Sequence, residues 1–211
     1  TPDGGNTAGV WIGDALPDPT VMQQIAADVG FSETAFLAPG DGHERVIRYY
    51  SPEAEVSFCG HATIAAGVAL GNLGGDGLYR LSTAIGEVPV HVRTREGQRE
   101  AALTSVAPRF EPAPAALLAE SLAALDWAAG DLDPAIPPAR AYAGAWHLVL
   151  AVRSPERLAS LDYDFARLKA AMLADGLTTL QLVWRETPDT FHARNPFPPG
   201  GVVEDPATGA A

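Results

Sequence analysis

The sequence predicts a mixed α/β (α+β) fold of two halves, each a curved, mostly antiparallel sheet around a central helix. Short strand patterns recur at regular spacing through residues 4–106, and only two helical patterns interrupt them. Residues 62–70 are rich in Ala and Gly, so strands could pack closely around this helix. Three prolines within residues 108–114 indicate a crossing between the halves, which we therefore expect at 1–107 and 108–211.

Periodicity predicts the individual elements. Apolar residues recur at three- and four-residue spacing from Thr20 to Val29 and indicate an amphipathic helix that ends at Gly30. Pro89 places its strand near an edge of the sheet, because proline donates no ladder hydrogen bond. Ser154 and Asp162 are expected to begin helices. The predicted strands lie within residues 4–13, 30–37, 43–50, 78–83, 85–92, 101–106, 145–152, 177–185 and 190–195, and the other helices within 61–71 and 115–125.

Composition restricts the class of partner. The 211 residues are 47% hydrophobic and 19% charged, as in ordinary globular proteins, and the formal net charge of −12 argues against binding nucleic acid or an anionic membrane. No apolar run approaches the ~20 residues that cross a bilayer, and no signal peptide is visible, so we expect a cytoplasmic protein. Cys59 is the single cysteine, which excludes an intramolecular disulfide, a Cys-rich zinc site and a two-thiol mechanism within one chain.

The stretch around the predicted central helix carries the first candidate site. A short apolar run ends at Cys59, Gly60 interrupts it, and helical spacing begins after His61. The backbone N–H groups and the dipole at a helix N-terminus favour an anion such as a carboxylate. The alternative is a buried helix whose cap is satisfied within the protein.

Four motifs are spread over nearly the whole chain. They are Gly4-Gly5-Asn6, Ser32-Glu33-Thr34, Cys59-Gly60-His61-Ala62-Thr63 and Glu204-Asp205-Pro206-Ala207-Thr208-Gly209. Together, and in this order, they resemble those of the PhzF-like isomerase family, which is related in fold to diaminopimelate epimerase. The resemblance implies a cofactor-independent isomerase that moves a proton on a small carboxylate-bearing substrate in the cleft between the halves. It also implies that we should expect a homodimer.

Glu33 is the candidate acid/base. Phe31, Ala35 and Phe36 surround it in the sequence, and an apolar environment raises the pKa of a carboxyl group that points inward. Such a group can take a proton from carbon on one side and return it on the other. The alternative is a strand glutamate that faces solvent. The resemblance implies the catalytic role for Glu33.

Two further residues complete the catalytic set that the resemblance implies. His61 would contact the substrate and assist proton transfer, and a helix N-terminus favours a neutral imidazole over an imidazolium there. Asp205 would contact the substrate. Its alternative role is the N-cap of a helix that begins at Pro206, and the two roles are compatible.

The remaining candidates hold or orient the substrate. The resemblance assigns substrate binding to Asn6, Gly60, Thr208, Gly209 and Ala210. Cys59 is a further candidate, although a small buried residue is the simpler interpretation. Ala210 stands where phenazine-producing members carry a serine, which leaves the identity of the substrate open. The other histidines have no metal-ligand spacing and no phosphate loop is present, so we expect neither metal nor cofactor.

Two expectations concern the whole protein. Family members continue beyond the position of Ala211 into a second central helix, so we expect further residues after Ala211 and a few before Thr1, or another chain that fills this place. The rival to the isomerase is a non-catalytic protein of the same fold that binds a small acid. The presence of Glu33, His61 and Asp205 together favours the enzyme.

Overall fold

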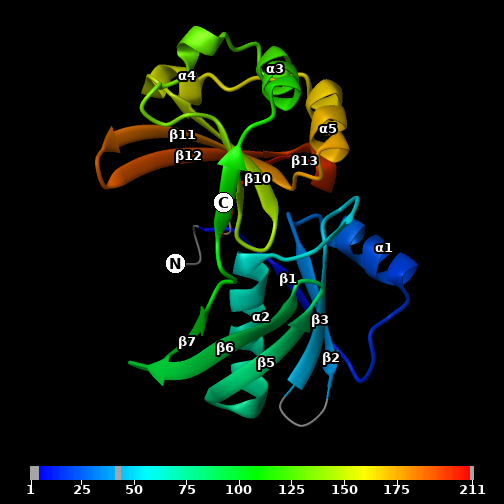
Figure 1. Cartoon of the computed structure of the whole chain (residues 1–211). Coiled ribbons are helices and arrows are strands. Elements are labelled where there is room, and N and C mark those ends of the chain that lie inside the picture. Colours follow the sequence, from blue (N-terminus) through cyan, green and yellow to red (C-terminus); the bar gives the residue numbers. More distant parts are fainter. Residues whose placement is uncertain (1–4, 41–43, 210–211) are drawn as a thin grey trace. The chain divides into compact units, whose positions relative to one another are not determined.

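A computed structural model describes residues 5–40 and 44–209, and the contacts between residues divide them into two compact units (Figure 1). The first unit ends at Ala107 and the second begins at Pro108. Each unit is an α+β structure with one mixed, mostly antiparallel sheet, as the sequence predicts. No helix in the described ranges is long and apolar enough to cross a membrane.

The sheet of the first unit has seven strands in the order β1-β2-β3-β5-β6-β7, with β4 paired to β3. Two pairs, β1 with β2 and β3 with β5, are parallel, and the other pairs are antiparallel. The strands are β1 (Gly9–Ile12), β2 (Thr34–Pro39), β3 (Glu44–Tyr50), β4 (Glu55–Val56), β5 (Gly77–Thr83), β6 (Gly86–Arg95) and β7 (Gln98–Leu103).

Helix α2 (Gly60–Gly74) packs against β6 and β7, and small residues make this approach close. A Cβ atom built on Gly67 would lie 2.7 Å from Val90 Cγ1, and one on Gly71 would lie 2.4 Å from Val92 Cγ1. Real Cβ atoms do not approach other atoms so closely. The strands therefore pack around a helix with little side chain, as residues 62–70 predict.

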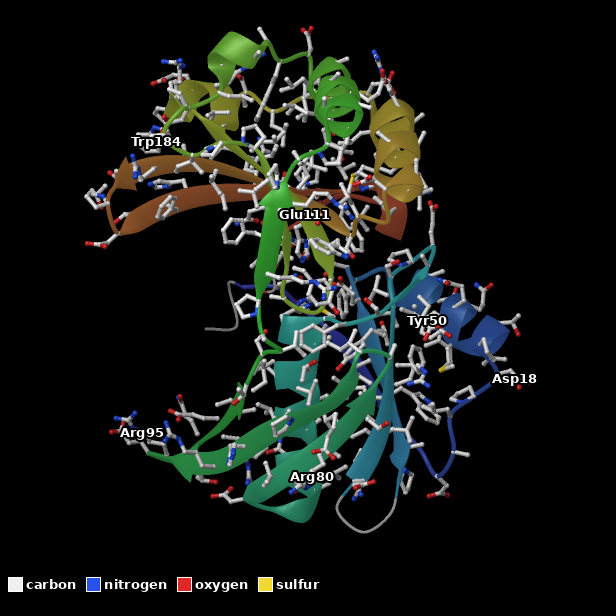
Figure 2. The ribbon with its side chains drawn as sticks, viewed as in Figure 1. Asp18, Tyr50, Arg80, Arg95, Glu111 and Trp184 are labelled. Carbon is white, nitrogen blue, oxygen red and sulfur yellow. The ribbon has the colours of Figure 1, made fainter. Side chains whose placement is uncertain are left out.

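Helix α1 (Pro19–Val29) packs on the same unit through a separate small core. Met22 and Ala26 of the helix meet Phe36 and Tyr50 of the sheet, and Figure 2 labels Tyr50. The helix ends at Gly30, whose φ of 71° lies in the left-handed region that favours glycine. The predicted helix thus ends at the predicted residue.

The second unit has a six-stranded sheet in the order β13-β12-β11-β10-β9-β8, in which only β10 and β11 are parallel. The strands are β8 (Arg109–Pro112), β9 (Ala139–Tyr142), β10 (Trp146–Val152), β11 (Thr179–Thr187), β12 (Thr190–Phe197) and β13 (Val202–Asp205). Two short 3₁₀ helices, η1 (Ala129–Asp131) and η2 (Pro198–Gly200), join the elements.

Three helices cover one face of this sheet (Figure 1). They are α3 (Ala115–Ala124), α4 (Pro155–Ala159) and α5 (Phe165–Ala174). Alternate residues of the central strands, including Leu148, Leu150, Leu180 and Leu182, form a core with the helices' apolar residues. Because side chains alternate between the faces of a strand, the residues between these leucines point to the other face.

The structure corrects two details of the sequence analysis. Pro89 does not mark an edge, because β6 lies between β5 and β7. The carbonyl of Pro89 accepts a hydrogen bond from Thr104 N at 3.5 Å, and Thr104 lies one residue beyond the end of β7. The N–H and C=O groups of a strand residue point to the same neighbouring strand. The N–H that proline lacks would therefore point beyond the end of β7, where it has no ladder hydrogen bond to make. The N-cap of α5 is Asp164, whose carboxylate accepts from Arg167 N, rather than Asp162.

Candidate functional site

Glu33 and His61 meet in the first unit, although 27 residues separate them in the chain. Glu33 immediately precedes β2 and His61 is the second residue of α2. Glu33 Oε2 lies 3.6 Å from His61 Nε2. Glu33 is 4% exposed, so the alternative of a solvent-facing glutamate does not hold.

Two groups contact the other ring nitrogen of His61. Cys59 Sγ lies 3.2 Å and Asn6 Nδ2 lies 3.5 Å from His61 Nδ1. Ser32 Oγ donates to Asn6 Oδ1 at 3.1 Å, which directs the NH₂ of Asn6 toward the histidine. Because an amide NH₂ and a thiol are donors, this arrangement favours Nδ1 as an acceptor and places the imidazole proton on Nε2, toward Glu33.

A buried hydroxyl pair fixes the start of α2. Thr63 Oγ1 donates to the Cys59 carbonyl at 2.6 Å, so Tyr49 must be the donor in its 2.7 Å hydrogen bond with Thr63 Oγ1. Burial raises the pKa of Tyr49 well above its usual value, so this donor stays protonated. The helix begins at Gly60, and the first-turn backbone N–H groups point out of its N-terminus beside His61.

Glu33, Cys59 and His61 also form a set of metal-ligand types. One ligand atom from each lies within 4.8 Å of the others. Zinc accepts carboxylate, thiolate and imidazole ligands, so these three residues are the ones that could hold a metal ion in the described part of the chain. The expectation of no metal stays a prediction.

The second unit holds the other candidates. Asp205, the last residue of β13, is 2% exposed and stands opposite Asn195 of β12. Thr208 Oγ1 donates to Asp205 Oδ2. Residues 206–209, which include Gly209, are not helical, so they show no helix that Asp205 would cap. Ala210 lies outside the described residues.

His147 of β10 is a buried polar residue that the sequence analysis did not single out. It is 1% exposed, and its Nδ1 shares a 2.8 Å hydrogen bond with Thr179 Oγ1. Burial lowers its pKa to about 4, and the charge of Asp205 opposes part of this shift. A histidine inside the apolar run 145–152 was the available signal, because buried strands rarely carry one without a partner.

The structure therefore brings together one part of the predicted site. Glu33, His61, Asn6 and Cys59 form a connected group beside Gly60 in the first unit. A buried carboxylate next to an imidazole N–H can exchange a proton with a bound molecule. The second unit supplies its own polar group, which contains Asp205, Thr208 and His147.

Comparison with known proteins gives one consistent result. A family model described as "Phenazine biosynthesis-like protein" (PhzC-PhzF) matches residues 1–211. The uncharacterized isomerase YfhB of Bacillus subtilis is 30% identical over 221 residues, which cover 100% of this chain and 74% of that protein. The uncharacterized isomerase PA2770 of Pseudomonas aeruginosa is 34% identical over 213 residues, with 100% and 74% covered.

A solved structure agrees with these sequence matches. The structure of a predicted epimerase, PA4716 from Pseudomonas aeruginosa, is similar with a TM-score of 0.83 and 26% sequence identity. The similarity covers 99% of this chain and 73% of that one. It extends over both units and so concerns the whole described fold.

Proposed function

Because the chain belongs to the PhzC-PhzF family of phenazine biosynthesis-like proteins, we propose that it is an isomerase that moves a proton on a small carboxylate-bearing substrate without a cofactor. The observation that carries this proposal is the buried Glu33 carboxylate 3.6 Å from His61 Nε2. Relatives that are named as uncharacterized isomerases support this class of reaction.

Glu33 performs the proton transfer in this proposal. Its carboxylate takes a proton from a substrate C–H bond, and the bonding electrons remain on the substrate, where a neighbouring unsaturated group delocalises them. The carboxylic acid then returns the proton to a different carbon, so the substrate is isomerised and Glu33 regains its charge. No electron leaves the substrate, so the step balances without an oxidant or reductant.

In this proposal, His61 and the start of α2 stabilise the negative charge of the substrate. The favoured tautomer of His61 directs Nε2–H toward the place where Glu33 acts, so it can donate to the acid/base or to the substrate. The backbone N–H groups at Gly60 suit the substrate carboxylate. Asn6 and Cys59 keep the imidazole in this tautomer through Nδ1.

Asp205 provides the substrate contact from the second unit in this proposal. Its side chain is buried and accepts from Thr208, which restricts its orientation. Gly209 and Ala210 follow directly and are proposed to bind the substrate through their backbone. The support for this part is the match of the family model across both units.

A screen for solvent deuterium uptake tests the proposal. Cyclic carboxylates and amino acids are incubated with the protein in D₂O, and carbon-bound deuterium is measured by NMR and mass spectrometry. At least one compound should gain deuterium at a carbon near its carboxylate faster than with buffer alone. Binding without exchange throughout the panel would favour the non-catalytic acid-binding protein instead.

A further inference from the structure

His147 lies on the face of the second unit's sheet opposite α3, α4 and α5. Its neighbour in β10, Leu148, packs in the core with these helices, so His147 points to the other face. Thr179 stands opposite His147 in β11 and bonds its Nδ1. The neighbouring strand therefore holds the imidazole ring of His147 through its Nδ1 atom.

Other polar side chains share this face. Asn195 Nδ2 donates to the side-chain oxygen of Gln181, which alternates with the core residues Leu180 and Leu182. Asp205 stands opposite Asn195, and directly opposed residues project from the same face of an antiparallel pair. The face thus carries a group of polar side chains, of which His147, Thr179, Asn195 and Asp205 are buried.

His147 Nε2 is the unsatisfied member of this group. It is buried and has no hydrogen-bond partner in the described part of the protein. A buried ring nitrogen without a partner is unfavourable, and a hydrogen bond to a bound molecule would remove this cost. Because the charge of Asp205 acts on His147, the two side chains lie near each other on this face.

The tautomer decides what Nε2 can bind. A proton on Nε2 would direct a positive N–H dipole to the unpartnered side of the ring, and the negative charge of Asp205 acts on this ring. In that tautomer Nδ1 would accept from the Thr179 hydroxyl, a direction with which their 2.8 Å separation is compatible. Burial lowers the pKa of His147 to about 4, so the ring is a neutral donor near neutral pH.

We propose that His147 is a further substrate-contact residue, whose Nε2–H donates a hydrogen bond to an oxygen of the carboxylate-bearing substrate. This inference rests on the proposed function and adds an imidazole donor to the candidates of the second unit, which are Asp205, Thr208, Gly209 and Ala210. A neutral donor can stabilise the charge that develops on the substrate oxygen when a proton leaves carbon.

Nitrogen NMR of the labelled 211-residue protein tests the tautomer without any need for turnover. Long-range ¹H–¹⁵N spectra distinguish Nε2–H from Nδ1–H in a neutral imidazole. We expect His147 to be a neutral Nε2–H tautomer from about pH 5 to pH 8, and Thr179→Val to weaken that preference. An Nδ1–H tautomer in the unaltered protein would overturn the inference.

Benzoate binding tests the contact itself. Benzoate is a planar carboxylate and resembles the planar species formed when a proton leaves a carbon beside a carboxylate. We expect benzoate to shift the His147 Nε2 resonance, and His147→Gln and His147→Phe each to weaken binding at least about tenfold. The control is His192→Gln, since His192 is exposed on β12 and pairs with Glu186. Unchanged affinity in folded His147 variants, or no benzoate effect at His147, would overturn the contact.

The outcomes separate this inference from the proposed function. Benzoate binding that depends on His147, with no deuterium uptake by any compound, would retain the contact and reject the isomerase. Deuterium uptake with benzoate affinity independent of His147 would reject the contact alone.

Discussion

At the scale of single residues, the proposed chemistry depends on whether Glu33 carries a proton. Glu33→Gln keeps the shape of the side chain and removes its ability to titrate. Turnover of any substrate found in the screen should therefore fall ~100-fold or more, while the benzoate dissociation constant changes little. The matched control is Glu44→Gln, because Glu44 is exposed on β3. Near-normal turnover in the Glu33→Gln variant would assign the base to another residue, with Cys59 the next candidate.

At the scale of elements, the contact of α2 with β6 depends on glycine. Gly71→Ala gains helix propensity of up to about 1 kcal/mol, but the new Cβ would lie 2.4 Å from Val92 Cγ1, and Val92 is buried. Overpacking typically costs about 1–3 kcal/mol, so it should exceed the gain and lower the free energy of unfolding by about 1–2 kcal/mol. Urea unfolding measures this change. Asn72→Ala, at an exposed position of α2, should be neutral or slightly stabilising, and a stabilising Gly71→Ala would refute the close packing.

At the scale of the whole molecule, His147 makes stability depend on pH. Its pKa falls from 6.5 to about 4 on folding, so between these values the unfolded chain binds a proton that the folded chain does not. The contribution of neutral His147 to the free energy of unfolding is therefore fully present above pH 6.5, and it is lost as the pH falls toward 4. Between about pH 7 and pH 4.5 the unfolding free energy should fall about 2–3 kcal/mol more than in His147→Gln. Tryptophan fluorescence during urea unfolding reports mainly on the second unit, which contains Trp127, Trp146 and Trp184, whereas Trp11 lies in the first unit. Parallel pH dependences of the two proteins would contradict this.

The sequence by itself determined the elements that depend on local pattern. The helix that ends at Gly30 follows from three- and four-residue spacing and a glycine stop, and the closely packed α2 follows from its small residues. The motif resemblance placed the chain in its family and named Glu33, His61 and Asp205 as candidates. These features need only neighbouring residues or short motifs, so they can be deduced without coordinates.

Only the tertiary structure decided which distant residues meet. The contact of Glu33 with His61 depends on how β2 and α2 pack, and the interior position of Pro89 depends on where β7 ends. His147 became a candidate because Thr179, from a strand later in the chain, satisfies one ring nitrogen while the sheet buries the other. Strand order arises from pairing between segments far apart in the chain. Local periodicity indicates which face of a strand is buried, but it does not identify the strand that pairs with it.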